Sequence, residues 1–207
     1  MISREKEILR VLANDVRMLS ADQVARTWWT DTRWGSCRCK ESLWDLAVRK
    51  WISMQPVLAR PIHLLVTPLL TWQAGQPLPQ FELLARQLHK RAKSQPAVIT
   101  VVYATSKTVS LFGKGKKPSI KIAQMTHDLH VSEIFLHLRA SGRYSARWLS
   151  EDQLPKAWPL DIRPDAVLLD DVGKPATAIE YGGDYSVQRL KELHAGFDSI
   201  GLGYELW

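Results

Sequence analysis

The first third of the chain reads as helices followed by strands. Apolar residues recur at helical spacing over residues 3–14, a second short helix is expected after a capping Ser20, and a third over residues 37–50. Residues 51–68 then look like two short strands around a central turn. Helix, helix, helix and β-ribbon is the order of a winged helix-turn-helix, which the pattern predicts for residues 1–75.

The middle of the chain is expected to connect its two ends over residues 76–125. Residues 79–93 have an amphipathic helical pattern with a basic polar face. Residues 98–104 and 108–112 are apolar runs typical of a strand pair. A glycine- and lysine-rich loop follows from Gly113.

The last part of the chain, residues 126–207, alternates helix and strand patterns. A helix over residues 126–142 precedes a short strand, and two further apolar strands flank a turn at residues 172–175. A helix over residues 186–197 and a last strand follow. The expected order is α-β-β-β-α-β, so we predict a small mixed α/β domain here and an α+β protein overall.

The composition is that of an ordinary folded protein with an excess of positive charge. Of 207 residues, 45% are hydrophobic and 24% are charged, which argues against a disordered chain. There are 28 Lys and Arg against 21 Asp and Glu, and the net charge of +7 fits a polyanion partner such as nucleic acid.

The two cysteines and the apolar runs bear on where the protein works. Cys37 and Cys39 are too close together for an easy disulfide and are expected as reduced thiols of a cytoplasmic protein. The charged N-terminus has no secretory signal pattern. No apolar run reaches about 18 residues, so no membrane span is expected.

Basic residues in the first half have the positions that a DNA-reading module requires. In a winged helix the third helix lies in the major groove, and the turn of the ribbon contacts the backbone or the minor groove. The residues expected to contact double-stranded DNA are Arg33, Arg38, Lys40 and Arg49 around the third helix, Arg60 at the wing tip, and Lys114, Lys116 and Lys117 in the glycine-rich loop. The same charges also fit the solvated surface of a module that recruits proteins. Dimers are common among winged-helix proteins, but the sequence has no heptad or other dimer signal.

Two carboxylates flank the predicted hairpin of the C-terminal domain. Pro164-Asp165 precedes its first strand, and Glu180 ends its second strand after an apolar run. With the α-β-β-β-α-β order, these residues resemble the PD-(D/E)xK nuclease fold over residues 126–207. That resemblance implies that Asp165 and Glu180 hold Mg²⁺, which polarises a phosphate and activates a water molecule.

The family pattern is incomplete at Gly182, where it asks for a lysine that positions the attacking water. Some members of the family move this lysine into the following helix, and Lys191 is the residue of this chain that fits. An acidic residue on the preceding helix often completes such a site, and Glu133 has that place. The departure at Gly182 therefore favours a degenerate domain that no longer cleaves DNA.

A narrower resemblance depends on the helix and the hairpin together. His127-Asp128-Leu129 opens the helix, and Pro164-Asp165 and Ile179-Glu180 follow at suitable distances. With a winged helix and a linking helix, the chain is similar to the replication-relaxation family of plasmids and other mobile elements. This resemblance implies a DNA-binding N-terminal module and a role in plasmid replication, DNA relaxation or mobilisation. It implies no established catalytic residues.

These expectations describe a DNA-binding accessory or regulatory protein of a mobile element, with a non-catalytic PD-(D/E)xK-like domain and no cofactor. One alternative is a Mg²⁺-dependent endonuclease that uses Glu133, Asp165, Glu180 and Lys191. Another is a winged-helix adaptor that binds proteins. Metal-dependent turnover separates the nuclease from the other two.

Overall fold

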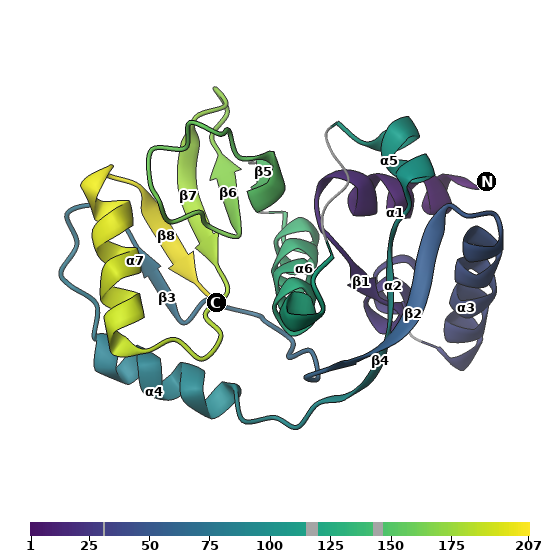
Figure 1. Ribbon diagram of the computed structural model, residues 1–207, viewed down its shortest axis with the longest axis horizontal. Coiled ribbons are helices and arrows are strands. Elements are labelled where there is room, and N and C mark those ends of the chain that lie inside the picture. Colours follow the sequence, from purple (N-terminus) through teal and green to yellow (C-terminus); the bar gives the residue numbers. More distant parts are fainter. Residues whose placement is uncertain (31, 115–119, 143–146) are drawn as a thin grey trace. The chain divides into compact units, whose positions relative to one another are not determined.

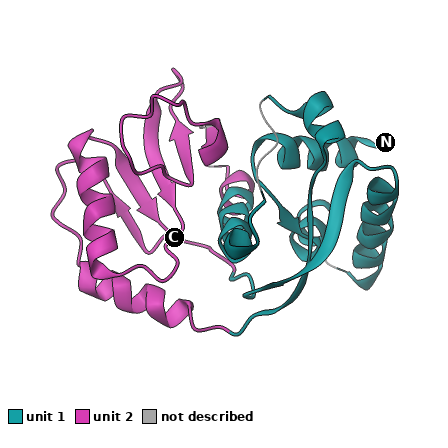
Figure 2. Cartoon of the chain, viewed as in Figure 1, with its two compact units in different colours: residues 1–63, 95–136 teal, residues 64–94, 137–207 magenta. Residues whose placement is uncertain are grey.

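The chain folds into two compact units of mixed helical and strand structure. The computed structural model describes residues 1–30, 32–114, 120–142 and 147–207 (Figure 1). Unit 1 comprises residues 1–63 and 95–136, and unit 2 comprises residues 64–94 and 137–207 (Figure 2). The predicted α+β class is confirmed. Within the described ranges, no helix combines the length and the apolar character needed to cross a lipid bilayer.

Unit 1 consists of helices around a three-stranded antiparallel sheet. The strand order is β1-β4-β2, so β4 is central. In chain order the elements are α1 (Ser3–Asn14), β1 (Leu19–Ser20), α2 (Ala21–Trp28), α3 (Arg33–Val48), β2 (Ile52–Ala59), β4 (Ala97–Ala104), α5 (Ser106–Phe112), a 3₁₀ turn (Ile122–Gln124) and most of α6 (Met125–Ala140).

Side-chain caps fix where the helices of unit 1 begin. The Ser20 hydroxyl accepts a hydrogen bond from the Gln23 backbone, and the Gln23 side chain accepts one from the Ser20 backbone, so α2 opens with a capping box. Thr32 caps α3 by accepting from the Gly35 backbone over 3.0 Å. Because of this cap, α3 begins at Arg33 and not at residue 37 as the sequence pattern indicated.

The apolar stripe predicted for the first helix is buried in unit 1. Ile8, Leu9 and Leu12 of α1 are 0% exposed. A separate buried cluster, made of Met18, Ala59, Val101, Met125 and Leu129, joins the sheet to α6. Removal of this apolar area from water stabilises the unit.

The strand that pairs with β2 is distant in sequence, so the predicted local ribbon is wrong. β2 pairs along its whole length with β4, from Ile52 opposite Ala104 to Ala59 opposite Ala97. Residues 60–68, expected as the second ribbon strand, have no strand structure. β4 is rich in β-branched residues, which suit a central strand. Local alternation identifies a strand but not its partner.

Residues 106–112 form helix α5, so the predicted strand over 108–112 is also wrong. The Thr105 side chain accepts a hydrogen bond from the Thr108 backbone and caps this helix. A short apolar run fits either a strand or a buried helix turn, and the cap decides between them.

Unit 2 has a five-stranded sheet in the order β3-β8-β7-β6-β5. β7 and β8 run parallel, and the other neighbouring strands are antiparallel. The elements are β3 (Leu70–Trp72), α4 (Phe81–Arg91), the end of α6, β5 (Arg147–Ser150), a 3₁₀ turn (Glu151–Gln153), β6 (Ala166–Leu169), β7 (Pro175–Glu180), α7 (Val187–Ser199) and β8 (Gly203–Leu206). The predicted α-β-β-β-α-β order and the β6–β7 hairpin are confirmed.

The core of unit 2 includes the helix that was expected in a linking region. Phe81, Leu84 and Leu88 of α4 are buried in one cluster with residues of α7, β7 and β8. Residues 95–125, also expected in that region, belong to unit 1. The compact units therefore differ from the expected divisions after residues 75 and 125, because β3 and α4 complete the C-terminal sheet and its helical cover.

Candidate functional site

The β6–β7 hairpin brings the two predicted carboxylates together. The register pairs Ala166 with Ile179, so Asp165 and Glu180, one residue further along each strand, lie at the same end of the hairpin. Asp165 Oδ2 accepts a hydrogen bond from the Tyr181 backbone over 2.7 Å. Glu180 is buried, with 3% of its surface exposed. We call Asp165 and Glu180 the carboxylate pair.

Tyr185 contacts the carboxylate pair from the loop before α7. Its hydroxyl donates a hydrogen bond to Glu180 Oε1 over 2.8 Å. Burial raises the pKa of Tyr185, and the negative charges of Glu180 and Asp165 raise that pKa further. The phenol therefore stays protonated and acts as a hydrogen-bond donor to Glu180. Sequence reasoning missed this residue, although a tyrosine five positions after Glu180 was a usable signal.

A side chain at residue 182, where the nuclease pattern has lysine, would have to displace two buried leucines. A Cβ atom on Gly182 would lie 2.8 Å from Leu88 Cδ2 and 2.9 Å from Leu206 Cδ1. Both leucines are 0% exposed. The absence of lysine at this position is therefore matched by close packing of α4 and β8 against the strand end.

Arg91 of α4 is a cation beside this strand end. Its guanidinium donates to the main-chain oxygens of Gly182 and Trp207, and it lies 4.9 Å from the centre of the Tyr181 ring. Burial lowers the pKa of Arg91. These bonds join α4 to the ends of β7 and β8, so Arg91 has a structural role here.

Lys191, the predicted substitute for the missing lysine, is directed to another partner. Its ammonium group lies 3.8 Å from Glu82 Oε1 on α4, and its side chain is 52% exposed. Gln188, one turn earlier on α7, donates to Glu192. The structure therefore does not bring Lys191 to the carboxylate pair.

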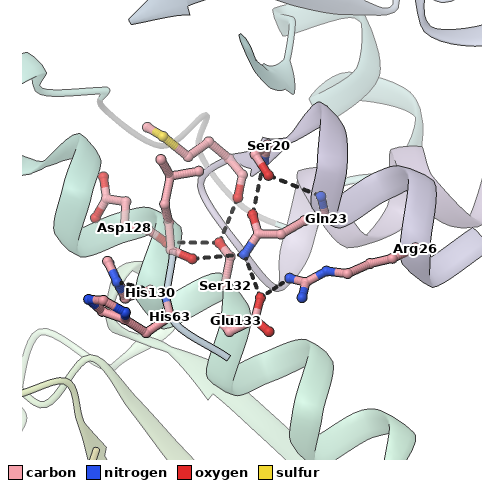
Figure 3. Close-up of polar contacts among 10 residues, drawn as sticks. Ser20, Gln23, Arg26, His63, Asp128, His130, Ser132 and Glu133 are labelled. Atoms are coloured by element: carbon pink, nitrogen blue, oxygen red, sulfur yellow. Dashed lines mark hydrogen bonds and ion pairs between the residues drawn. The ribbon is translucent and has the colours of Figure 1, made fainter. Parts of the chain in front are cut away.

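Glu133 belongs to a buried polar network in unit 1 (Figure 3). Its Oε2 accepts from Gln23 Nε2 over 3.0 Å and forms an ion pair with Arg26. Gln23 Nε2 also donates to the Leu129 carbonyl over 2.9 Å. Glu133 thus connects α6 to α2, and its described contacts do not include Asp165 or Glu180.

The carboxylate pair supplies a small set of metal ligands. No cluster of three or more His, Cys, Asp or Glu suited to a metal occurs among the residues that the structure describes. Two carboxylates with substrate phosphate oxygens are one common way of holding Mg²⁺. Asp165 and Glu180 fit that minimal set, with the remaining ligands left to water and substrate.

The predicted DNA-contacting residues differ in their surroundings. Arg38 of α3 pairs with Glu41, and Arg49, the C-cap of α3, pairs with Asp45, each over 2.9 Å. Arg33 and Lys40 are exposed. The Arg60 backbone donates to the Thr126 side chain, and the Lys114 backbone donates to Asn14 Oδ1. Lys116 and Lys117 lie outside the described residues.

The positive charge of the chain is concentrated in unit 1. Unit 1 has 16 Lys and Arg against 9 Asp and Glu, which is a net charge of +7. Unit 2 has 12 of each kind and is neutral. Net charge therefore attracts a polyanion to unit 1 and not to unit 2.

Comparison of the chain with protein-family models, with curated proteins and with solved structures finds no match.

Proposed function

We propose that this protein binds DNA through unit 1 and acts as an accessory or regulatory factor in the replication, relaxation or transfer of a plasmid or other mobile element. The element order of unit 1 supports a winged helix. The helices α1, α2 and α3 precede two long paired strands, and the short β1 between α1 and α2 pairs with the second of them. In this arrangement α3 is the helix that approaches DNA.

The observation that carries the proposal is the uneven charge. All of the net charge of +7 comes from unit 1, while unit 2 is neutral. Neutralisation of phosphates by such a unit releases counterions, so binding weakens as salt is added. Affinity for duplex DNA that stays flat between low and moderate salt would contradict the proposal.

We also propose that unit 2 is a PD-(D/E)xK-like domain that does not hydrolyse DNA. The α-β-β-β-α-β order and the carboxylate pair support the likeness. The packing at Gly182 and the Glu82 contact of Lys191 support the loss of activity, because neither residue supplies a cation at the pair. Without the lysine of the family pattern the transition state loses electrostatic stabilisation.

A Mg²⁺-dependent endonuclease is the second candidate, and the closeness of Asp165 and Glu180 favours it. In that function the two carboxylates would hold the ion, which would polarise the scissile phosphate. Tyr185 would orient Glu180 through its hydroxyl, and Arg91 would keep the strand ends together. The chain's own residues would then have to position the water without lysine at residue 182.

One gel separates the two candidates. Purified protein is incubated with supercoiled plasmid in Mg²⁺, in Mn²⁺ and in EDTA, and each sample is run with and without protease treatment. We expect a protease-sensitive shift without nicking. Nicked or linear product that needs metal and disappears in Glu180→Ala would establish the nuclease instead.

A further inference from the structure

The outward face of α3 exposes two tryptophans and a valine. Its buried side consists of Gly35, Cys39, Leu43 and Leu46. On the opposite side, at helical spacing, lie Trp34, Cys37, Glu41, Trp44 and Val48, which we call the outer stripe. Trp34 is 69%, Trp44 64% and Val48 65% exposed. Figure 1 shows α3 beside β2 at one edge of unit 1.

Exposed indole rings together on one helix mark an interaction surface. Cations border them. The Arg38 guanidinium lies 5.8 Å from the centre of the Trp34 ring, and Arg33 and Lys40 are exposed on the same helix. Glu41, the acidic member of the outer stripe, is paired with Arg38 over 2.9 Å, and both side chains stay exposed to water.

We propose that the outer stripe of α3 binds unpaired nucleotides, with bases stacked on Trp34 and Trp44 and the backbone along Arg33 and Lys40. The inference rests on DNA binding by unit 1 and specifies the form of DNA that α3 takes. Aromatic faces among cations are the recurring way of holding single strands, because every base has a face to stack. The two tryptophans are separated by about 15 Å along the helix axis, a distance that a few nucleotides span.

The same stripe is poorly suited to reading bases in an intact duplex. Base edges in the major groove are recognised by polar side chains and bidentate cations. Two indoles and a valine offer little of this, whereas the faces of unpaired bases are open to them. α3 therefore fits opened or single-stranded DNA better than a closed major groove.

A second copy of the chain fits the stripe less well. Glu41 lies midway between Trp34 and Val48. If two such helices packed with their outer stripes aligned over the whole length, parallel or antiparallel, the two Glu41 side chains would meet at the centre. Like charges facing each other in a helix interface disfavour that pairing.

Fluorescence anisotropy with labelled DNA tests the assignment. The probes are an oligo-dT of about 15 nucleotides, a blunt duplex, and the same duplex with a bubble of about 6 unpaired bases. Trp34→Leu and Trp44→Leu keep an apolar side chain but remove the aromatic face. Each should weaken binding to oligo-dT and to the bubble about tenfold, with little effect on the blunt duplex. Trp34→Phe and Trp44→Phe should retain most of the affinity, and Val48→Ala is the matched control in the same stripe.

The possible outcomes distinguish failure of this inference from failure of the proposed DNA binding by unit 1. Wild-type preference for the blunt duplex, or leucine variants that bind oligo-dT normally, would overturn stacking while leaving DNA binding intact. If none of the three DNA probes binds at low salt, the proposed DNA binding by unit 1 is wrong as well. A dimer in sedimentation velocity that Trp44→Ala dissociates would assign the stripe to a second copy and would also overturn the inference.

Discussion

The hydroxyl of Tyr185 donates a hydrogen bond to Glu180 over 2.8 Å, and this bond orients the buried member of the carboxylate pair. The phenol is half-buried, and burial and the nearby carboxylates raise its pKa, so it acts as a hydrogen-bond donor. The neutral phenol gives Glu180 a hydrogen bond but brings no positive charge to the site. This differs from a lysine, which would offset the charge of a metal-activated hydroxide or of the phosphate in the transition state.

Loss of this hydroxyl should destabilise unit 2. Tyr185→Phe removes the hydrogen bond to Glu180 and leaves that buried carboxyl oxygen poorly solvated. We expect the free energy of unfolding to fall by about 2 kcal/mol. Urea denaturation followed by circular dichroism measures the change. Tyr103→Phe is the control, because the described contacts of the half-buried Tyr103 include no hydrogen bond from its hydroxyl. Equal effects of the two substitutions would mean that the Tyr185–Glu180 bond is not stabilising.

A side chain at residue 182 should destabilise the fold without restoring cleavage. Gly182→Ala places Cβ within 3 Å of Leu88 and Leu206, and repacking these leucines costs about 1–3 kcal/mol. Gly183→Ala is the matched control, because a Cβ there meets nothing within 4 Å. Thermal unfolding of the two variants measures the difference. A stable Gly182→Lys variant that gained metal-dependent nicking would contradict the account of this site given above.

Glu133 should contribute to stability and not to catalysis. Glu133→Ala removes a buried carboxylate that Arg26 and Gln23 contact, and we expect a loss of about 2–3 kcal/mol. Glu41→Ala in the same unit removes an exposed partner of Arg38 and should cost no more than about 0.5 kcal/mol. Urea denaturation compares them. A Glu133→Ala variant that kept normal stability but lost a metal-dependent activity would instead indicate that Glu133 belongs to the nuclease site.

Local patterns in the sequence were sufficient for the order of elements from α6 to β8, but not for β3 and α4, which complete that sheet and its helical cover. The helices and strands from α6 to β8 follow apolar runs separated by turn residues, and the β6–β7 hairpin closes over a short turn with Gly173 at a φ of 83°. Asp165 and Glu180 could be paired in advance because the hairpin is local. Glu133 could not be placed, because Gln23 and Arg26 lie more than 100 residues away in sequence.

Unit 1 was harder to predict because its sheet is not local. β2 and β4 are adjacent in the sheet, yet residues 60–96 separate them in the chain. The predicted start of α3 was also four residues too late, which hid part of its exposed face. A helix assumed to begin at residue 37 leaves Trp34 out, so the outer stripe is visible only once the Thr32 cap is known.

Arg33 and Lys40 should contribute to DNA binding through phosphate contacts. The double substitution Arg33→Ala and Lys40→Ala should weaken binding to all DNA probes and reduce the dependence of log K on log salt by about 1–2. Lys174→Ala, in the β6–β7 turn of neutral unit 2, is the control. Filter binding at several salt concentrations measures both quantities. An unchanged salt slope in the double variant would remove these residues from the interface.

Asp15 should make unit 1 less stable as the pH rises. It is the C-cap of α1, where the helix dipole disfavours negative charge, and burial raises its pKa from 3.8 to about 6, although Lys114 partly opposes this. Below pH 3.8 the carboxyl is protonated in both the folded and the unfolded chain. Between pH 3.8 and about 6 the unfolded chain loses the proton first, so stability falls with rising pH and then stays level.

Asp15→Asn should therefore be neutral near pH 4 and stabilising by about 2–3 kcal/mol at pH 7.5, because asparagine keeps the shape and removes the charge. Urea denaturation at the two pH values measures the effect. Asp22→Asn, in the first turn of α2, is the reverse control. Negative charge is favourable at that end of a helix, so this change should destabilise slightly at pH 7.5. The same gain from Asp15→Asn at both pH values would show that shape or hydrogen bonding is responsible and not the buried charge.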